Sequence, residues 1–286
     1  MEKKYNIDRQ VVCGFGDEWQ RFPQDKLDQA EKQRIFNAYF KIFPWELLNA
    51  GKSVGADIGC GSGRWATLAA SKARLLYLID ASEKALDVAR INLKNFSNVE
   101  FKNVSADSLP FEDNTLDFAY SLGVLHHVPD TEGAVRSVSR KLKPGAPFLI
   151  YLYYNFDNRN VWYRRLWKLS ESARRIISGL PFALRSFLCE IIALTVYLPV
   201  ARIGRFFSRL GIKTDSWPLA YYQNTSFYLM RTCALDRFGT GLEKRFSREQ
   251  IRHMLERSGF TDIQFSDSPP YWCAVGIKET DDSAGT

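Results

Sequence analysis

Ser53-Val-Gly-Ala-Asp57-Ile-Gly59-Cys-Gly61-Ser-Gly63-Arg64-Trp65 is the stretch that decides the fold of this chain. A short apolar run ends on an acid, turns through glycines at every second position, and enters a helical pattern at Trp65. Glycine permits a tight turn and a close approach to a ligand, because it lacks the Cβ atom that disfavours positive φ. A strand, glycine turn and helix in this order also point free backbone N–H groups at a ligand. The stretch therefore predicts a ligand-binding turn.

The spacing of the glycines separates two kinds of ligand. A dinucleotide-binding turn has the pattern G-x-G-x-x-G, whereas this turn reads G-x-G-x-G. Asp57 stands two residues before the first glycine, where a carboxylate would repel a pyrophosphate but would suit a ligand that carries an ammonium group. Both features argue against a nucleotide-dependent oxidoreductase.

Apolar runs alternate with helical patterns around this turn, which is typical of a parallel sheet with crossover helices. The predicted strands are residues 53–58, 74–79, 99–104, 116–121 and 146–153, and the predicted helices are 63–72, 83–95 and 130–142. Ser82 is the expected cap of the second helix. Ligands of such sheets bind at the carboxyl ends of the strands. Asp57, Asp80, Asp107 and residues 121–127 all fall at those ends.

Both ends of the chain extend this pattern. Residues 24–43 read as a helix that Pro44 stops, and residues 1–23 are polar with an aromatic cluster. Near the C-terminus, Ser247 and Gln250 form a capping box that predicts a helix to residue 257, followed by strands 261–266 and 271–278 and a polar tail.

Three motifs resemble the class I methyltransferases that use S-adenosylmethionine, of the type 11-like small-molecule kind. They are DIGCGSGR from Asp57, LPFEDNTLDFAYSLGVLHHVPD from Leu109 and LKPGAPFLIYLYY from Leu142. The resemblance is dense over residues 50–153. It implies an α/β fold with a Rossmann-like, seven-stranded sheet and helices on both faces. It also implies S-adenosyl-L-methionine as the cofactor and S-adenosyl-L-homocysteine as the product.

In that family the acid before the glycine turn helps to hold the methionine end of the cofactor. Asp80 matches the acid that accepts hydrogen bonds from the ribose hydroxyls, and Asp107 matches the acid that bonds the adenine amino group. The resemblance implies cofactor contacts at Asp57, Gly59, Cys60, Gly61, Gly63, Asp80, Ala81, Ser82, Ala106, Asp107, Ser108, Ser121 and Leu122.

The implied reaction is in-line displacement of a methyl group from a sulfonium by an oxygen, nitrogen or carbon nucleophile. His126 and His127 follow the fourth strand and are two of only three histidines. Histidine is the side chain best suited to take a proton near neutral pH. His126 is the candidate general base, with His127 left to packing or orientation. The alternative is that both are structural. His253 reads as a surface residue, and no metal site is visible.

The α/β pattern breaks after Tyr153 for about ninety residues. Within this insertion an apolar stripe at helical spacing contains Trp162, Leu166, Leu169, Ala173, Ile176 and Leu180. Residues 161–211 hold nine Lys and Arg against two Glu, so their net charge equals the +7 of the whole chain. The apolar run 191–201 is bracketed by charges and is too short to span a bilayer.

Three interpretations of the insertion remain open. It is a helical subdomain that caps the substrate side of the sheet, or a surface that meets anionic lipid or a lipid-linked substrate, or a nucleic-acid-binding element. The last is disfavoured because no RNA-binding module is recognisable. The predicted division is an N-terminal helical lid or cover (1–48), an S-adenosylmethionine-binding methyltransferase domain (49–154 and 242–280), a basic helical insertion that caps the substrate (155–241) and a polar tail (281–286).

Candidate lid and substrate residues are Phe15, Trp19, Phe22, Arg64, Tyr153, Tyr221 and Tyr222.

The predicted function is O-methylation of a sugar-like, polyketide-like or lipid-linked small molecule. The alternatives are a lipid or quinone methyltransferase at a membrane surface and a non-catalytic cofactor-binding protein, with an RNA methyltransferase last. The five scattered cysteines and the lack of an apolar signal core in MEKKYNIDRQ favour a cytoplasmic protein, with peripheral contact at the inner face of the membrane as an option.

Overall fold

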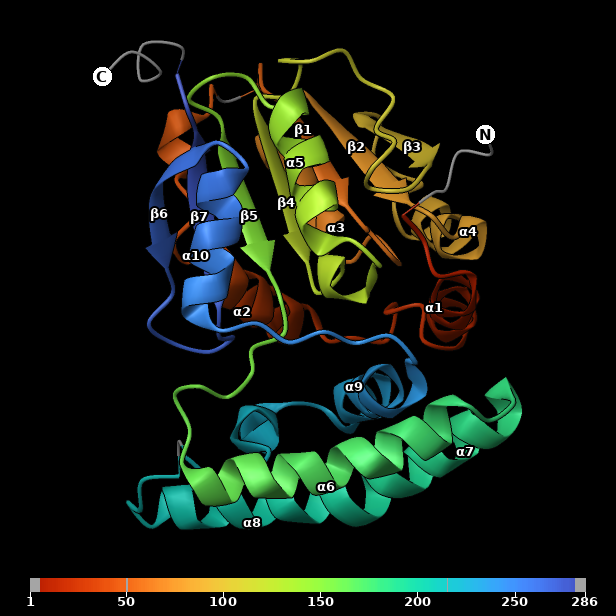
Figure 1. The fold of residues 1–286 in the computed structure, drawn as a ribbon. Coiled ribbons are helices and arrows are strands. Elements are labelled where there is room, and N and C mark those ends of the chain that lie inside the picture. The colour runs from red at the N-terminus through yellow and green to blue at the C-terminus, as the bar shows by residue number, and fades with distance from the viewer. Residues whose placement is uncertain (1–5, 50, 215, 281–286) are drawn as a thin grey trace. The chain divides into compact units, whose positions relative to one another are not determined.

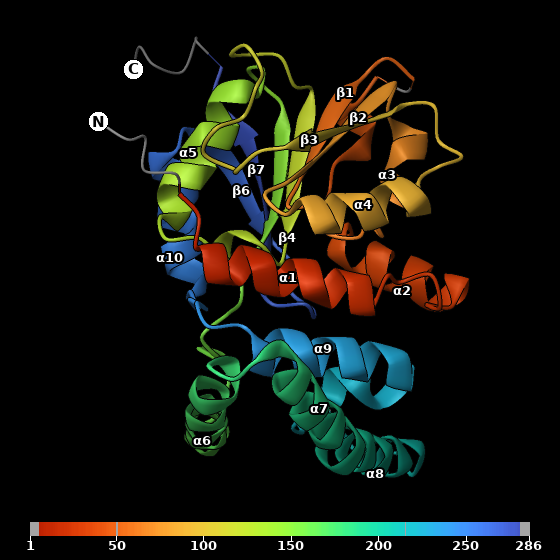
Figure 2. The same ribbon diagram turned by 90° about the vertical axis from the view of Figure 1, so that its right-hand side faces the viewer.

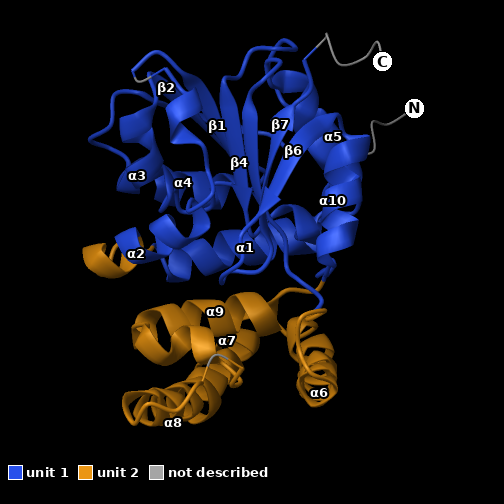
Figure 3. Ribbon diagram, turned by 90° about the vertical axis from the view of Figure 1, so that its left-hand side faces the viewer, with its two compact units in different colours: residues 1–23, 33–155, 242–286 blue, residues 24–32, 156–241 orange. Residues whose placement is uncertain are grey.

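A computed structural model describes residues 6–49, 51–214 and 216–280. The predicted tail 281–286 and the first residues of the predicted lid lie outside this description. The chain divides into two compact units (Figure 3): unit 1 is residues 1–23, 33–155 and 242–286, and unit 2 is residues 24–32 and 156–241.

Unit 1 is built on a seven-stranded sheet (Figure 1) with the order β3-β2-β1-β4-β5-β7-β6. The strands are β1 Val54–Ile58, β2 Leu75–Asp80, β3 Val99–Asn103, β4 Phe118–Leu122, β5 Pro147–Tyr151, β6 Phe260–Phe265 and β7 Cys273–Lys278. Strands β1 to β5 pair in parallel, and β7 is antiparallel to both β5 and β6. The predicted Rossmann-like, seven-stranded fold is confirmed.

The order of the sheet reverses at β1, which lies between β2 and β4. Asp57 on β1 is in register with Leu78 on β2 and with Tyr120 on β4. These central strands are buried on both faces, which explains their nearly continuous apolar runs. The register therefore places Asp57, an acid, inside the core and next to Tyr120.

Helices cover both faces of the sheet (Figure 2). Helices α3 Ala66–Ala69 and α4 Glu83–Asn92 lie on one face, and α5 Thr131–Lys141 and α10 Arg248–Arg257 lie on the other. The predicted capping box at the start of α10 is present. Ser82 stands at the N-cap of α4, but its hydroxyl does not accept the expected capping bond. Its backbone N–H instead donates to Asp80.

Two helices precede the sheet. Helix α2 Gln29–Tyr39 is shorter than the predicted 24–43, and α1 Arg9–Arg21 lies in the predicted helical lid, in a part for which no helix bounds were predicted. Asp8 caps α1 by accepting from the backbone of Gln10 and Val11. Two glycines within α1 weaken its helical signal. One of them, Gly16, is needed for packing, because a Cβ there would lie 2.5 Å from the Ser82 hydroxyl.

Unit 2 is helical. It contains α6 Val161–Ser178, α7 Phe182–Ile192, a π turn Ala193–Tyr197, α8 Leu198–Arg209, a 3-10 turn Ala220–Asn224 and α9 Phe227–Gly239. The segments from α7 to α8 form one continuous helix of 28 residues, Phe182–Arg209, which is long and apolar enough to cross a membrane by length and composition. The sequence indicated a much shorter apolar segment. Pro199 lies just after the π turn, in the first turn of α8, and there it does not end the helix. The helix is therefore longer than the apolar segment in the sequence.

Candidate active site

The glycine turn after β1 closes against the loop after β4. Gly59, Gly61 and Gly63 have φ values of +78°, +54° and +71°, which side chains with a Cβ rarely adopt. A Cβ on Gly59 would also lie 2.3 Å from the Val124 side chain. The turn is tied to β2, because the N–H groups of Gly59 and Cys60 both donate to the carbonyl of Ile79 at 2.7 and 2.9 Å. These two loops flank the point where the strand order reverses.

Asp57 is a buried acid at the start of this turn. Its side chain is only 2% exposed, and its Oδ2 atom has no hydrogen-bond partner among the described residues. Burial, reinforced by the nearby Asp80 carboxylate, raises the pKa of Asp57 to about 8, while the Tyr120 hydroxyl and Arg64 act in the opposite direction. A buried carboxyl group with a spare oxygen suits a cationic ligand, because such a ligand would stabilise its charged form.

Asp80 ends β2 and holds the turn in place. Its Oδ2 accepts from the N–H of Gly61 at 2.9 Å, and its Oδ1 accepts from the N–H of Ser82 at 2.8 Å. Burial raises the pKa of Asp80, and these two N–H groups partly offset that effect. Each carboxylate oxygen has a second lone pair, so both can still accept from ligand hydroxyls.

Asp107 follows β3 and is joined to the N-terminal segment. Its Oδ2 accepts from the backbone N–H of Asn6 at 3.0 Å, and its other oxygen accepts from the Ser105 hydroxyl. The Asn6 side chain also exchanges two hydrogen bonds of 2.6 Å with the backbone of Asp130. Sequence reasoning missed Asn6, which has no motif of its own. Because this carboxylate already accepts a hydrogen bond from an N–H group, it could also accept one from an amino group of a ligand.

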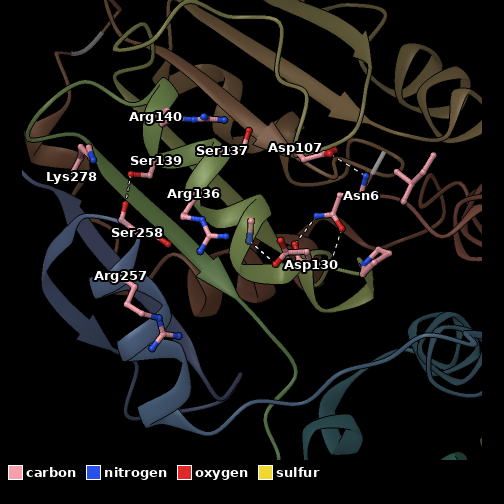
Figure 4. Close-up of a pocket in the computed structure, with 13 residues that line it drawn as sticks. Asn6, Asp107, Asp130, Arg136, Ser137, Ser139, Arg140, Arg257, Ser258 and Lys278 are labelled. Carbon is pink, nitrogen blue, oxygen red and sulfur yellow. Dashed lines mark hydrogen bonds between the residues drawn. The ribbon is translucent and has the colours of Figure 1, made fainter. Parts of the chain in front are cut away.

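A cavity of about 760 Å³ lies beside Asp107 on the α5 and α10 side of the sheet (Figure 4). Its lining includes Arg136, Arg140, Arg257 and Lys278. Glu132 accepts from Arg136 at 2.9 Å and from Arg257 at 2.8 Å, which neutralises part of this charge. Of the residues predicted to contact the cofactor, only Asp107 lines this cavity.

Helix α1 packs along the carboxyl edge of the sheet (Figure 2). A Cβ on Gly61 would lie 2.7 Å from the Trp19 ring, which is therefore in close contact with the glycine turn. Arg64 stands 5.4 Å over the same ring. The Asp17–Lys84 ion pair, at 2.6 Å, holds α1 to α4. Phe22 is buried at the end of α1. Of the predicted lid residues, Phe15 and Trp19 thus lie in α1, and Phe22 is its C-cap.

The histidine pair lies in a 3-10 turn, Leu125–His127, after β4. His126 is 0% exposed, and its ring stacks on Tyr153 at 3.9 Å. Neither ring nitrogen of His126 has a hydrogen-bond partner among the described residues. Burial, with His127 and Arg245 adding to it, holds the pKa of His126 well below its usual range. His126 is therefore neutral at physiological pH, and the lowered pKa also makes it a weaker base than a free imidazole.

His127 has a different environment from its neighbour. Its Nδ1 lies 2.7 Å from the carbonyl of Leu242, and its ring packs 5.0 Å from Phe15 of α1. The N–H of Lys244 donates to the carbonyl of His126 at 3.0 Å. The segment that returns from unit 2 is thus fastened to the histidine turn. These contacts hold the His127 ring in place. The roles of His126 as general base and of His127 in packing or orientation stay predictions.

The other predicted residues fall into two groups. The Ser121 hydroxyl donates to the carbonyl of Ile58 and ties β4 to β1 at 2.9 Å. Leu122 ends β4, and Cys60, Ala81, Ala106 and Ser108 lie in the loops after β1, β2 and β3. Tyr221 and Tyr222 belong to unit 2, where Tyr222 packs 5.0 Å from Tyr197. Their substrate role also stays a prediction.

These residues fit S-adenosylmethionine on structural grounds. Asp57 offers an unpartnered carboxyl oxygen to an ammonium group, Asp80 offers two oxygens to vicinal hydroxyls, and Asp107 accepts N–H donors. The backbone turn between them is shaped by glycines that tolerate no Cβ.

Comparisons with known proteins agree with this geometry. Residues 56–150 match a family described as "Methyltransferase domain". A ubiquinone biosynthesis O-methyltransferase of Thiobacillus denitrificans is 36% identical over 113 residues, which is 39% of this chain and 47% of the relative. A demethylmenaquinone methyltransferase of Staphylococcus aureus is 39% identical over 93 residues, which is 31% of this chain and 38% of the relative. The chain therefore spans less than half the length of these relatives.

A solved structure shares the fold at low sequence identity. It is a candidate methyltransferase of Bacillus halodurans C-125, which superimposes with a TM-score of 0.52 at 13% identity and covers 86% of this chain and 99% of its own. This likeness concerns the fold alone.

Proposed function

We propose that this chain, which carries a class I S-adenosylmethionine-dependent methyltransferase domain, transfers the methyl group of that cofactor to an oxygen atom of a small-molecule acceptor. The observation that carries the proposal is the row of three acids at successive strand ends, Asp57, Asp80 and Asp107, beside a glycine turn at the reversal of the sheet. Each acid has the free acceptor capacity that a different part of the cofactor needs.

The three acids would divide the cofactor among them. Asp57 would receive the ammonium group of the methionine end, Asp80 the two ribose hydroxyls, and Asp107 the adenine amino group. When bound, the cofactor supplies a methyl group on a sulfonium, which is already activated for displacement. The protein then has to orient the acceptor, exclude water and accept a proton.

His126 is the residue that we propose accepts that proton. An acceptor hydroxyl that attacks the methyl carbon must lose its proton, and His126 is neutral, buried and without a hydrogen-bond partner on either ring nitrogen among the described residues. Tyr153 stacks on its ring and fixes its plane. Helix α1, through Phe15 and Trp19, would exclude water from the reacting groups. Because the His126 side chain is fully buried, the residues that cover it have to move for the acceptor to enter.

The named relatives favour a quinone-like acceptor over the other acceptor classes. Both names contain a quinone, and one of them also names O-methylation. Sugar-like and polyketide-like acceptors come second, because neither of these two relatives is named for such an acceptor. A quinol hydroxyl would also suit the aromatic surroundings of the histidine pair, where Tyr153 stacks on His126 and Phe15 packs against His127.

Titration calorimetry on the purified chain tests the cofactor. S-adenosylhomocysteine should bind and NAD should not. Binding of NAD alone would contradict the proposal.

The acceptor is then tested by mass spectrometry after incubation with S-adenosylmethionine and either a demethylated quinol or a panel of sugars. We expect one added methyl group on the quinol. Asp80→Ala should lose the reaction, whereas Asp87→Ala, which changes an exposed acid on α4, should keep it.

A further inference from the structure

The apolar stripe of α6 points to solvent. Trp162, Leu166, Leu169 and Ile176 are between 46 and 71% exposed. The side of α6 that is buried contains Arg174, Ile177 and Ser178 instead. Soluble proteins rarely expose apolar side chains in such a continuous row. The stripe therefore has no covering element among the described residues.

The helix Phe182–Arg209 repeats this arrangement. Eight of its large apolar side chains, counting the residue that follows its end, are 40 to 62% exposed: Leu184, Phe187, Ile191, Leu194, Val196, Ile203, Phe206 and Leu210. Most of them follow one another at steps of three or four residues, so they share a side of the helix.

The opposite side of the same helix is already packed. Its buried residues are mostly small or polar and include Ser186, Cys189, Ala193, Ala201 and Gly204. Helix α9 contacts both α6 and α7, and it lies on one side of them in Figures 1 and 2. Unit 2 therefore has its own core around α9. We call the exposed apolar side chains of α6 and of Phe182–Arg209 the outer face.

Positive charge accompanies the outer face. Arg164, Arg165, Lys168 and Arg175 are exposed on α6, next to its apolar stripe. The two acids of residues 161–211 are engaged by arginines: Glu171 pairs with Arg174 and Arg237 and more distantly, at 3.7 Å, with Arg175, and Glu190 pairs with Arg231. Since these acids are neutralised within unit 2, the charge that reaches solvent beside the outer face is positive.

We propose that the outer face binds an anionic lipid bilayer, with α6 and Phe182–Arg209 lying in the plane of the headgroups. Apolar side chains flanked by Lys and Arg are the pattern of interfacial helices, in which the apolar side enters the acyl boundary and the cations meet lipid phosphates. The positive charge of the outer face distinguishes a membrane from a second copy of this chain as its partner. A second copy of the same face would bring like charges together, whereas an anionic membrane complements them.

The same helix does not cross the bilayer. In the most apolar stretch of this helix, only 28% is buried in the protein. The helix nevertheless contains two charged residues, Arg185 and Glu190, on or near its packed side. A crossing would carry these charges, with the core of unit 2, into hydrocarbon, where charged groups are costly. Binding in the plane leaves the core of unit 2 intact.

Flotation of the full-length protein with vesicles tests the proposal, in the absence of cofactor and acceptor. We expect binding to vesicles of phosphatidylglycerol and phosphatidylcholine, little binding to phosphatidylcholine alone, and loss of binding as salt rises from about 0.1 to about 1 M. The variant Phe187→Ser with Phe206→Ser should bind about tenfold more weakly or worse. Its matched control, Leu47→Ser with Ile91→Ser, removes equally exposed apolar side chains from unit 1 and should bind like the unmodified protein.

Three results would overturn the proposal. They are absence of binding to anionic vesicles, equal loss in the variant and its control, and a lipid-free dimer that the Phe187 and Phe206 substitutions dissociate in analytical ultracentrifugation. Circular dichroism and thermal unfolding of each variant show that it is folded. Because the assay contains neither cofactor nor acceptor, its failure would leave the proposed methyl transfer untouched.

Discussion

Helices α10 and α6 both carry an amphipathic pattern, but they use their apolar sides differently. Ile251, Met254 and Leu255 of α10 are at most 5% exposed, because they pack into the core that the sheet of unit 1 provides. Trp162, Leu166, Leu169 and Ile176 of α6 are 46 to 71% exposed. An apolar stripe therefore predicts a helix and its apolar side, but it does not predict what covers that side.

The same contrast separates two tasks. Unit 1 places its polar groups at the carboxyl edge of the sheet, where a cofactor would bind, whereas unit 2 exposes apolar and basic groups that suit a membrane. If this division is correct, a substitution in one unit should change one property and leave the other unchanged.

The largest effect is expected from Asp80→Ala. Loss of a half-buried carboxylate that can accept from two ribose hydroxyls should weaken S-adenosylhomocysteine binding on the order of 1,000-fold. Calorimetry measures this loss, and thermal unfolding checks the fold. Vesicle binding should not change. Tight cofactor binding by the variant would remove Asp80 from the site.

His126→Gln should lower turnover about 100-fold, because glutamine has no basic nitrogen to take the acceptor proton. The dissociation constant for S-adenosylhomocysteine should stay the same. Single-turnover kinetics with the identified acceptor measures the effect, and His253→Gln on the exposed surface of α10 is the matched control. An equal rate in both variants would leave His126 with a packing role.

The affinity for the cofactor should rise with pH, by up to about tenfold per pH unit, until about pH 8. The pKa of Asp57 is raised to about 8 in the free protein, and an ammonium group needs the ionised carboxylate, so binding below that pH must release the proton. In Asp57→Asn the affinity should be lower and its pH dependence flatter. Calorimetry at a series of pH values would contradict this account if both proteins gave parallel curves.

The pH dependence of the free energy of unfolding gives an independent measure of the raised pKa of Asp57. Because the folded pKa of Asp57 lies above the ordinary value of 3.8, the folded state retains a proton that the unfolded state releases. The stability of the cofactor-free protein should therefore fall as pH rises from about 4 to about 8. Urea unfolding should show a smaller fall in Asp57→Asn.

The smallest effect is expected from single charges on α6. Lys168→Gln should weaken binding to anionic vesicles about fivefold, since one cation near the membrane surface contributes about 1 kcal/mol. Lys94→Gln, an exposed lysine of unit 1, is the control and should bind normally. Both should retain cofactor binding. Equal behaviour of the two variants would show that the position of the charge does not matter.

Much of unit 1 could be predicted from the sequence, because its signals are local. The glycine turn, the acids at Asp57 and Asp80, and the capping box at Ser247 each depend on neighbouring residues, and all lie where they were expected. Each predicted strand of the sheet is found within about two residues of its predicted bounds.

Other features could not be predicted, because they depend on contacts distant in sequence. Helix α1 contains two glycines and is held by partners far along the chain, among them Lys84 and His127. The bond from Asn6 to Asp107 joins residues 101 positions apart. The exposure of the α6 stripe is likewise a property of the folded unit. Identity of the acceptor depends on side chains outside the motifs.

The central claim is methyl transfer to a small molecule, and labelled S-adenosylmethionine tests it most directly. The purified chain is incubated with the labelled cofactor and an extract of the source cells, which is then separated into lipid, RNA and water-soluble pools. We predict label in the lipid pool, and none with Asp80→Ala. Label in RNA, or no label in any pool although S-adenosylhomocysteine binds, would contradict the account.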